Sequence, residues 1–329
     1  MKPFAVVFAL LLTSMAALAQ PADIGQPPGR LVDVGQRKLH LHCVGTGSPT
    51  VVLEAGASSF ALDWSLVQPE VARNQRVCAY DRAGSGWSDP RADVETPARI
   101  VNDLHTLLTT AGEKPPFVMV GASAGGLYVR LYQLEYPAEV AGLVLVDPST
   151  EDRLFAMFQQ RAVPIASLTS EQLMTTLPSS AVAVPSRAPQ AGAPFDRLPP
   201  DLYQLRLKID QRLIASFPPS VPAEIVRESS EGQRAALARL LDNRSREGRA
   251  IRNVPLIVLT RGQGGTPGIA ESHAALARLS TRSHHVVVQD AGHEIHLFSP
   301  AVVTQAIEDV SMAARGSAGG VLGRTQTPN

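Results

Sequence analysis

The sequence predicts an α/β fold built on a mostly parallel β-sheet with helices on both faces. Residues 116–120 and 140–146 are short, almost wholly apolar runs, as expected for strands that are buried on both sides. Segments with helical periodicity alternate with such runs, which is typical of parallel sheets. The chain of 329 residues, of which 44% are hydrophobic, is also long enough to bury a substantial core.

The charge balance gives no sign of a polyanionic partner. Lys and Arg together number 30, as do Asp and Glu, so the formal net charge is zero. Neither nucleic acid nor an anionic membrane surface is therefore expected as a partner.

Residues 1–19 have the pattern of a secretory signal peptide. Lys2 precedes an apolar run at residues 4–12, and Ala17-Leu18-Ala19 offers the small residues at which such leaders are cleaved. The apolar run is short for a membrane span, and no Cys follows Ala19 that could carry a lipid. We expect export to the periplasm or the medium without a stable membrane anchor. The alternatives are a buried N-terminal helix or a membrane anchor.

The first part of the core is expected over residues 20–149. The predicted strands are residues 31–34, 38–44, 50–54, 76–80, 116–120 and 140–146. The first two form a hairpin. A helix begins after Thr96, which can cap it, and ends at Gly112, and a second helix follows Gly125 and ends before Pro137.

The pattern changes over residues 150–253, where helical stretches alternate with segments rich in Pro, Ala and Ser, and no strand-like run is evident. This segment is predicted to be a helical lid inserted between two strands, and such insertions lie over the strand ends where ligands bind. A separate small domain or a loop is the alternative. The core resumes over residues 254–314, with strands at 256–260 and 285–289, and a flexible tail is expected over residues 315–329.

The run Gly121-Ala122-Ser123-Ala124-Gly125 lies between a short apolar strand and an amphipathic helix. In this setting a sharp turn can lift a serine above the sheet, and glycines relieve the backbone crowding. The N-terminus of the helix would stabilise an oxyanion. Ser123 is therefore the candidate nucleophile, and the alternative is a glycine-rich turn with an idle serine.

A serine hydroxyl needs a base, and His293 is the best candidate because it follows the strand at residues 285–289. Asp147, directly after the strand at 140–146, is the candidate acid that orients His293. After residues 256–260 no carboxylate occurs until Glu271, which is expected inside a helix. The alternative for Asp147 is a turn or N-cap residue.

The backbone N–H groups of Ala124 and Ala57 are the candidate oxyanion hole. Phe60 and Trp64 follow closely and could line an acyl pocket, or be ordinary core residues. His40 and His42 share one face of a predicted strand, but no third metal ligand is evident, so no metal site is predicted and both are expected to be exposed to solvent.

Several motifs resemble, in order, the signatures of the α/β-hydrolase fold family, in particular its serine hydrolase and esterase-like members. They are Val51-Val52-Leu53-Glu54-Ala55-Gly56, Tyr80-Asp81-Arg82-Ala83-Gly84-Ser85-Gly86-Trp87-Ser88, Gly121-Ala122-Ser123-Ala124-Gly125-Gly126, Leu143-Val144-Leu145-Val146-Asp147 and Ala291-Gly292-His293. The similarity covers about residues 31–150 and 254–313. It implies an eight-stranded, mostly parallel sheet, a Ser, acid and His triad, and no cofactor.

Two departures from the family pattern stand out. Ala55 occupies the place of the common His before the oxyanion glycine. The usual acid position after the seventh strand holds no carboxylate, so Asp147 relies on a placement after the sixth strand, which some members use. The family's strand order also puts the strand of Cys43 beside that of Cys78. A disulfide between them is therefore conceivable, and two small core side chains are the alternative.

The leading hypothesis is hydrolysis of a small-molecule carboxylic ester through an acyl-serine intermediate. A serine nucleophile disfavours epoxide hydrolysis and dehalogenation, for which members of the resembled family use an aspartate at this position. Hydrolysis of an amide or peptide, including release of an N-terminal proline, uses the same triad and is the enzymatic alternative. The non-enzymatic alternative is a binding protein on a hydrolase scaffold.

Overall fold

The computed structural model describes residues 23–177, 179–180, 182–183, 188–245, 251 and 253–316. The expected signal peptide, residues 1–19, lies outside the described residues, as do residues 317–329 of the expected tail. Export, flexibility of the tail and the domain boundaries therefore stay predictions.

Eight strands form one sheet in the order β1-β2-β4-β3-β5-β6-β11-β12. Their bounds are β1 (Arg30–Asp33), β2 (Lys38–Val44), β3 (Thr50–Glu54), β4 (Val77–Tyr80), β5 (Phe117–Ala122), β6 (Val140–Val146), β11 (Leu256–Arg261) and β12 (Ser283–Val288). Only β1 with β2 and β2 with β4 pair in antiparallel fashion, and the other neighbours in this sheet are parallel. The predicted mostly parallel, eight-stranded sheet is thus confirmed.

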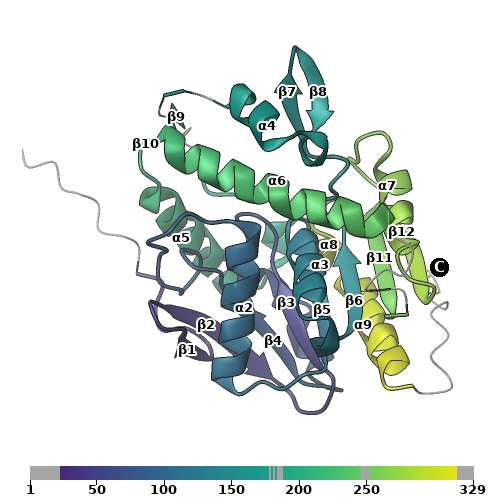
Figure 1. Cartoon of the computed structure of the whole chain (residues 1–329). Helices are drawn as coiled ribbons and strands as arrows, with labels where there is room; N and C mark the ends of the chain where they lie inside the picture. The colour runs from purple at the N-terminus through teal and green to yellow at the C-terminus, as the bar shows by residue number, and fades with distance from the viewer. Residues whose placement is uncertain are drawn as a thin grey trace, which may run out of the picture.

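Helices cover both faces of this sheet (Figure 1). The α-helices of the core are α1 (Gln68–Val71), α2 (Pro97–Ala111), α3 (Gly125–Glu135), α7 (Ile269–Ala277), α8 (Ile295–Phe298) and α9 (Pro300–Ala314). The buried side chains of α2, α3 and α7 form one hydrophobic cluster with one face of the strands, and those of α1, α8 and α9 form another with the opposite face. Short 3-10 helices are η1 (Ala61–Trp64), η2 (Pro137–Glu139), η3 (Ile165–Ser167) and η4 (Phe195–Arg197).

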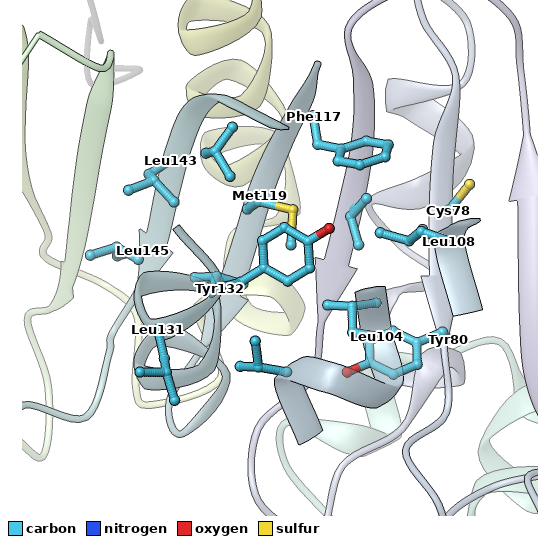
Figure 2. Close-up of a cluster of buried hydrophobic side chains, with 14 of the residues drawn as sticks. Cys78, Tyr80, Leu104, Leu108, Phe117, Met119, Leu131, Tyr132, Leu143 and Leu145 are labelled. Carbon is cyan, nitrogen blue, oxygen red and sulfur yellow. The ribbon is translucent and has the colours of Figure 1, made fainter. Parts of the chain in front are cut away.

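The first cluster shows how the alternation along a strand builds the core. Phe117 and Met119 of β5 point to the face that α2 and α3 cover, where Leu104, Leu108 and Tyr132 lie against them (Figure 2). The intervening residues of the strand, Val118 and Val120, belong to the other cluster. This two-sided burial is the reason why the strand is apolar at every position.

In the described part of the segment between β6 and β11, the α-helices are α4 (Ser170–Thr176), α5 (Pro200–Ser216) and α6 (Ala223–Ser245). Figure 1 shows α6 running across the molecule next to α2 and α3. Its described residues also form small antiparallel strand pairs, β7 (Phe155–Phe158) with β8 (Arg161–Pro164) and β9 (Val182–Ala183) with β10 (Ser220–Val221). The expectation of no strands here is therefore wrong. In the described residues they form two separate two-stranded sheets. Each strand is only two to four residues long, too short for a strand pattern to stand out in the sequence.

A buried ion pair fastens α5 to the core. Arg206 donates through Nε to Asp63 Oδ1 over 2.8 Å, and both side chains are almost completely buried. The Arg206 guanidinium also lies over the rings of Phe60 and Phe195. Helix α5 of the segment between β6 and β11 is thereby fixed to η1 of the core.

None of the helices that the structure describes is long and apolar enough to cross a membrane.

The expectation that His40 is exposed is wrong. His40 is completely buried, with Nδ1 2.7 Å from Asp81 Oδ2 and Nε2 2.5 Å from the carbonyl oxygen of Pro28. The reason is that β2 lies between β1 and β4 instead of at the edge of the sheet, and the segment around Pro28 covers it. His42 on the same strand is half-buried.

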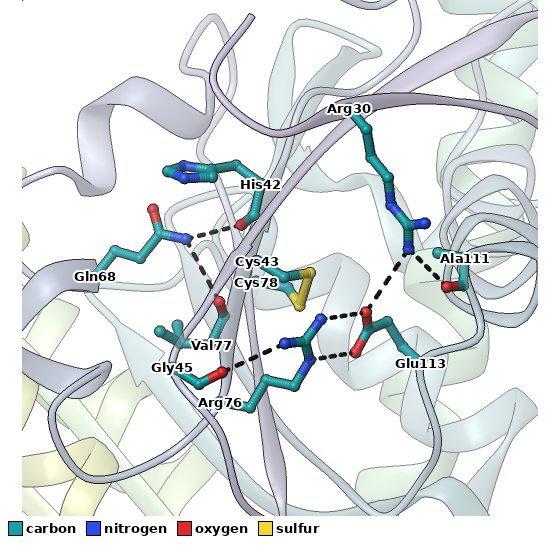
Figure 3. The surroundings of a disulfide bond; sticks show 10 residues. All are labelled: Arg30, His42, Cys43, Gly45, Gln68, Arg76, Val77, Cys78, Ala111 and Glu113. Carbon is teal, nitrogen blue, oxygen red and sulfur yellow. Dashed lines mark hydrogen bonds and ion pairs between the residues drawn. A yellow bond between two sulfur atoms is a disulfide. The ribbon is translucent and has the colours of Figure 1, made fainter.

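Cys43 and Cys78 form a disulfide, which decides between the two alternatives that the sequence leaves open. They are directly opposite partners on β2 and β4, with Cα atoms 4.0 Å apart (Figure 3). The bond links residues 35 positions apart in sequence.

Reduction of this disulfide is expected to lower the free energy of unfolding by about 4 kcal/mol. The reason is that the bond closes a loop of this length and thereby lowers the conformational entropy of the unfolded chain. Urea unfolding with and without reductant measures the effect, and mass analysis confirms the reduction. The double variant Cys43→Ala, Cys78→Ala is the control and should not respond to reductant. Equal unfolding free energies of the reduced and oxidised wild type would contradict the prediction.

Candidate active site

Ser123 occupies a sharp turn between β5 and α3. Its φ of 51° is in the left-handed region, which costs energy for a residue with a side chain. A Cβ added to Gly121 would lie 2.4 Å from the carbonyl oxygen of Gly125, and one added to Gly125 would lie 2.6 Å from that of Glu54. The backbone can therefore approach itself this closely only because both positions are glycines.

The structure brings Ser123, His293 and Asp147 together from three loops that follow β5, β12 and β6. His293 Nε2 lies 2.9 Å from Ser123 Oγ, and His293 Nδ1 lies 2.5 Å from Asp147 Oδ2. In this arrangement the hydroxyl can donate to Nε2 while the Nδ1–H donates to the carboxylate. A base in this state can accept the proton of Ser123 and keep the positive charge that results beside a carboxylate.

Asp147 is held in place by β11. The carboxylate is fully buried, its Oδ1 accepts from the backbone N–H of Arg261 over 3.0 Å, and Arg261 Nε lies 2.8 Å from Oδ2. The residue itself has a φ of 42°, so it is also a turn residue, as the alternative reading of the sequence has it. A hydrogen bond and an ion pair from Arg261 thus hold the carboxylate in position beside His293.

His273 on α7 is a neighbour of the acid that the sequence did not suggest. Its Nδ1 lies 4.0 Å from Asp147 Oδ1, and its Nε2 is 2.8 Å from the carbonyl oxygen of Pro148. Burial lowers the pKa of His273, so the ring is neutral near pH 7 and adds no second positive charge beside the carboxylate. Glu271, two residues earlier, is exposed.

Ala57 and Ala124, the two predicted oxyanion donors, border the same cavity as Ser123. A Cβ on Gly56 would lie 3.2 Å from Ser123 Cβ, so the turn that carries Ala57 lies directly against the nucleophile. Among the hydrogen bonds of the described residues, none is donated by the backbone N–H of Ala57 or of Ala124. Both groups are thus free to bind a negatively charged oxygen.

The cavity at Ser123 has a volume of about 300 Å³ and extends between α3, the start of α2, and α6. Most of its wall is apolar, formed by Ile100, Leu127, Leu131, Leu154, Ala236, Leu237 and Leu240. Polar groups on the wall include Thr96, Tyr128 and Gln233. A Cβ added to Gly232 would lie 2.5 Å from Thr96 Cγ2, so the glycine allows α6 to pack tightly on the start of α2.

Phe60 and Trp64 do not border this cavity. Both are completely buried, Phe60 beside Arg206 and Trp64 against the ring of His296 at a centroid distance of 4.6 Å. This burial agrees with the alternative that they are ordinary core residues, and the lining of an acyl pocket stays a prediction. The sequence of this strand-to-helix segment does not indicate in which direction the two aromatic side chains point.

The sequence did not predict a buried polar cluster next to the turn that carries Ala57. Glu54 at the end of β3 pairs with Arg82 at 2.5 Å and accepts a hydrogen bond from Tyr80. Burial raises the pKa of Glu54, and the Arg82 charge opposes this effect. A carboxylate that ends an otherwise apolar strand is a signal of such a cluster, because a buried charge requires a partner.

Comparisons with known proteins show the family of the chain. Residues 49–300 match the sequence model of the family described as alpha/beta hydrolase fold. The uncharacterised protein YqjL of Bacillus subtilis is 23% identical over 278 residues, which are 83% of this chain and 87% of that protein. A 2-hydroxymuconate semialdehyde hydrolase of a Pseudomonas species is 31% identical over 121 residues, or 36% and 42% of the two chains. A thermophilic esterase of Thermogutta terrifontis superposes with a TM-score of 0.57 at 22% identity, covering 84% of this chain and 94% of the other.

The position of the acid leads to a direct test by substitution. Asp147→Asn is expected to lower kcat about 10⁴-fold on any substrate that the chain turns over, because an amide cannot hold the productive tautomer of His293. Glu271→Gln, which changes an exposed carboxylate on α7, should leave kcat unchanged. Loss of activity in the Glu271 variant with an active Asp147 variant would show that the acid is misassigned.

Proposed function

The chain belongs to the α/β-hydrolase fold family, and from this premise we propose that it is a serine hydrolase that cleaves carboxylic esters. The observation that carries the proposal is the continuous hydrogen-bonded series from Ser123 through His293 to Asp147, beside two unbonded backbone N–H groups. An acyl transfer needs this combination of an activated nucleophile and preorganised oxyanion donors.

The proposed reaction has two halves. Ser123 Oγ attacks the ester carbonyl carbon while His293 Nε2 takes the hydroxyl proton, and the N–H groups of Ala57 and Ala124 bind the oxyanion. The C–O bond to the alcohol then breaks, and His293 returns the proton to the departing alkoxide. Water attacks the acyl-serine in the same manner, which releases the carboxylic acid and restores Ser123. In both halves Asp147 compensates the imidazolium charge.

The cavity supports an apolar group as the part of the substrate next to the ester. Its wall at α6 is formed by Ser229, Gln233, Ala236, Leu237 and Leu240, which recur at helical spacing on one side of the helix and of which the last three are apolar. An alkyl chain that enters this space loses contact with water and gains contacts with leucine side chains. The named esterase and hydrolase among the similar proteins support the same general reaction class.

Ester hydrolysis is tested with purified protein and a series of p-nitrophenyl esters of graded acyl length. The wild type should release the phenol and be labelled by a fluorophosphonate, whereas Ser123→Ala should lose both properties by at least about 10³-fold with an unchanged unfolding curve. Turnover of p-nitroanilides but not of the esters would favour the amide alternative. An unlabelled, inactive wild type would indicate a binding protein.

The role of α6 is tested by filling the cavity. Ala236→Leu should lower kcat/KM for the longest accepted acyl chain about tenfold or more and leave the shortest ester nearly unaffected, because the added side chain occupies the space of the chain end. Ala238→Leu is the matched control, since Ala238 is only half-buried and lies on the other side of the helix. An equal loss for all chain lengths would contradict a role of this wall in selectivity.

A further inference from the structure

Arg82 makes three contacts with the end of β3 and the turn that follows it. One guanidinium nitrogen, Nη1, lies 2.5 Å from Glu54 Oε1 and donates to the carbonyl oxygen of Ala55 over 2.7 Å. The other, Nη2, donates to the carbonyl oxygen of Gly56 over 2.5 Å. The Arg82 side chain is 10% exposed, so these bonds are little weakened by water.

The bond to Gly56 determines where the N–H of Ala57 points. In a trans peptide the carbonyl of one residue and the N–H of the next point in opposite directions across a rigid plane. With the Gly56 oxygen fixed on Arg82, the Ala57 N–H is directed away from Arg82, and Ala57 borders the cavity that Ser123 shares. Rotation of this peptide would turn the N–H away from the substrate and the carbonyl oxygen toward it.

Gly56 itself offers little resistance to such a rotation, because a residue without Cβ has broad conformational freedom. A larger residue would crowd the nucleophile, since its Cβ would lie 3.2 Å from Ser123 Cβ. The peptide therefore has to be held through its carbonyl oxygen. Besides Arg82, only the backbone N–H of Ser59 donates to that oxygen among the bonds of the described residues, over 3.2 Å.

Arg82 is suited to this task by its charge and its shape. Burial disfavours the charged guanidinium, but the neighbouring acidic groups, with Glu54 the largest contributor, together outweigh this effect and raise the pKa of Arg82 above its ordinary value, so the charge is permanent. The positively charged guanidinium bonded to the Gly56 carbonyl polarises the peptide group, which makes its N–H a stronger hydrogen-bond donor. The planar guanidinium can bind the carboxylate and both carbonyl oxygens together, which a single ammonium group cannot do with the same geometry.

We propose that Arg82 is a positioning residue of the oxyanion hole, which holds the Gly56 carbonyl so that the Ala57 N–H binds the oxyanion of the tetrahedral intermediate. Glu54 and Tyr80 in turn hold the guanidinium. This inference rests on the proposed ester hydrolysis. The competing explanation is that Arg82 merely fastens β3 to β4.

The experiment compares Arg82→Lys with Arg76→Lys. Arg76 is a matched control because it also pairs with a carboxylate, Glu113, and with a backbone carbonyl, that of Gly45, beside the disulfide and away from Ser123 (Figure 3). Arg82→Lys should lower kcat for esters about 10²-fold with little change in KM, as loss of one oxyanion donor does. Arg76→Lys should keep wild-type kinetics.

A second measurement separates positioning from a merely structural role. An alkyl trifluoromethyl ketone forms a tetrahedral adduct with the serine that carries an oxyanion, so its affinity reports on the hole. In Arg82→Lys this affinity should fall by the same factor as kcat/KM, with an unchanged unfolding midpoint. If Arg82→Lys does not fold, the double variant Glu54→Gln, Arg82→Gln leaves no unpaired buried charge and should show the same parallel loss.

The outcomes are distinct. A kcat within twofold of the wild type, or a reduced kcat with unchanged affinity for the ketone, overturns the role of Arg82 and leaves ester hydrolysis intact. A wild type that cleaves no ester and binds no ketone overturns both proposals. Parallel losses in kcat/KM and ketone affinity with an unaffected Arg76 variant support them.

Discussion

Backbone crowding at the nucleophile is the constraint on which the rest of the site depends. Added Cβ atoms at Gly121, Gly125 and Gly126 would lie within about 2.6 Å of other atoms of the fold, namely the turn itself, the end of β3 and Pro148. The turn after β5 therefore packs directly against the end of β3 and against the loop after β6. The same approach brings Ser123 against Gly56 on one side and, through the loop after β6, near Asp147 on the other.

Two arginines stabilise the two sides of this turn in different ways. Arg261 contacts the carboxylate of Asp147 at the end of β6, and Arg82 contacts that of Glu54 at the end of β3. In each pair a guanidinium nitrogen lies within ion-pair distance of a buried carboxylate oxygen. The carboxylate of Asp147 still accepts from His293, whereas that of Glu54 is bonded to Tyr80 and Arg82. An arginine–carboxylate pair thus lies at each of these two strand ends. The pair after β6 includes the candidate acid of the triad, and the pair at the end of β3 lies beside the turn that carries Ala57.

The sequence predicted the features that follow from repeated local patterns. The strands Thr50–Glu54 and Val140–Val146 have the predicted bounds, because buried parallel strands are uniformly apolar. The structure also brings Ser123, Asp147 and His293 together, since loops at one edge of a parallel sheet converge. The structure differs from the prediction where the burial of a side chain depends on the direction in which it points or on residues distant in the sequence. The burial of His40 depends on a covering segment, and Phe60 could not be assigned to core or pocket from its position in the chain.

The backbone at Ser123 and Asp147 has consequences beyond geometry. Both residues adopt positive φ angles that are unfavourable for every residue except glycine, at a cost of about 1 to 3 kcal/mol each. Glycine would adopt either angle freely but can neither attack a carbonyl nor orient an imidazole. Selection for a more stable chain and selection for an active one therefore act in opposite directions at these two positions, and the many contacts around them compensate for the difference.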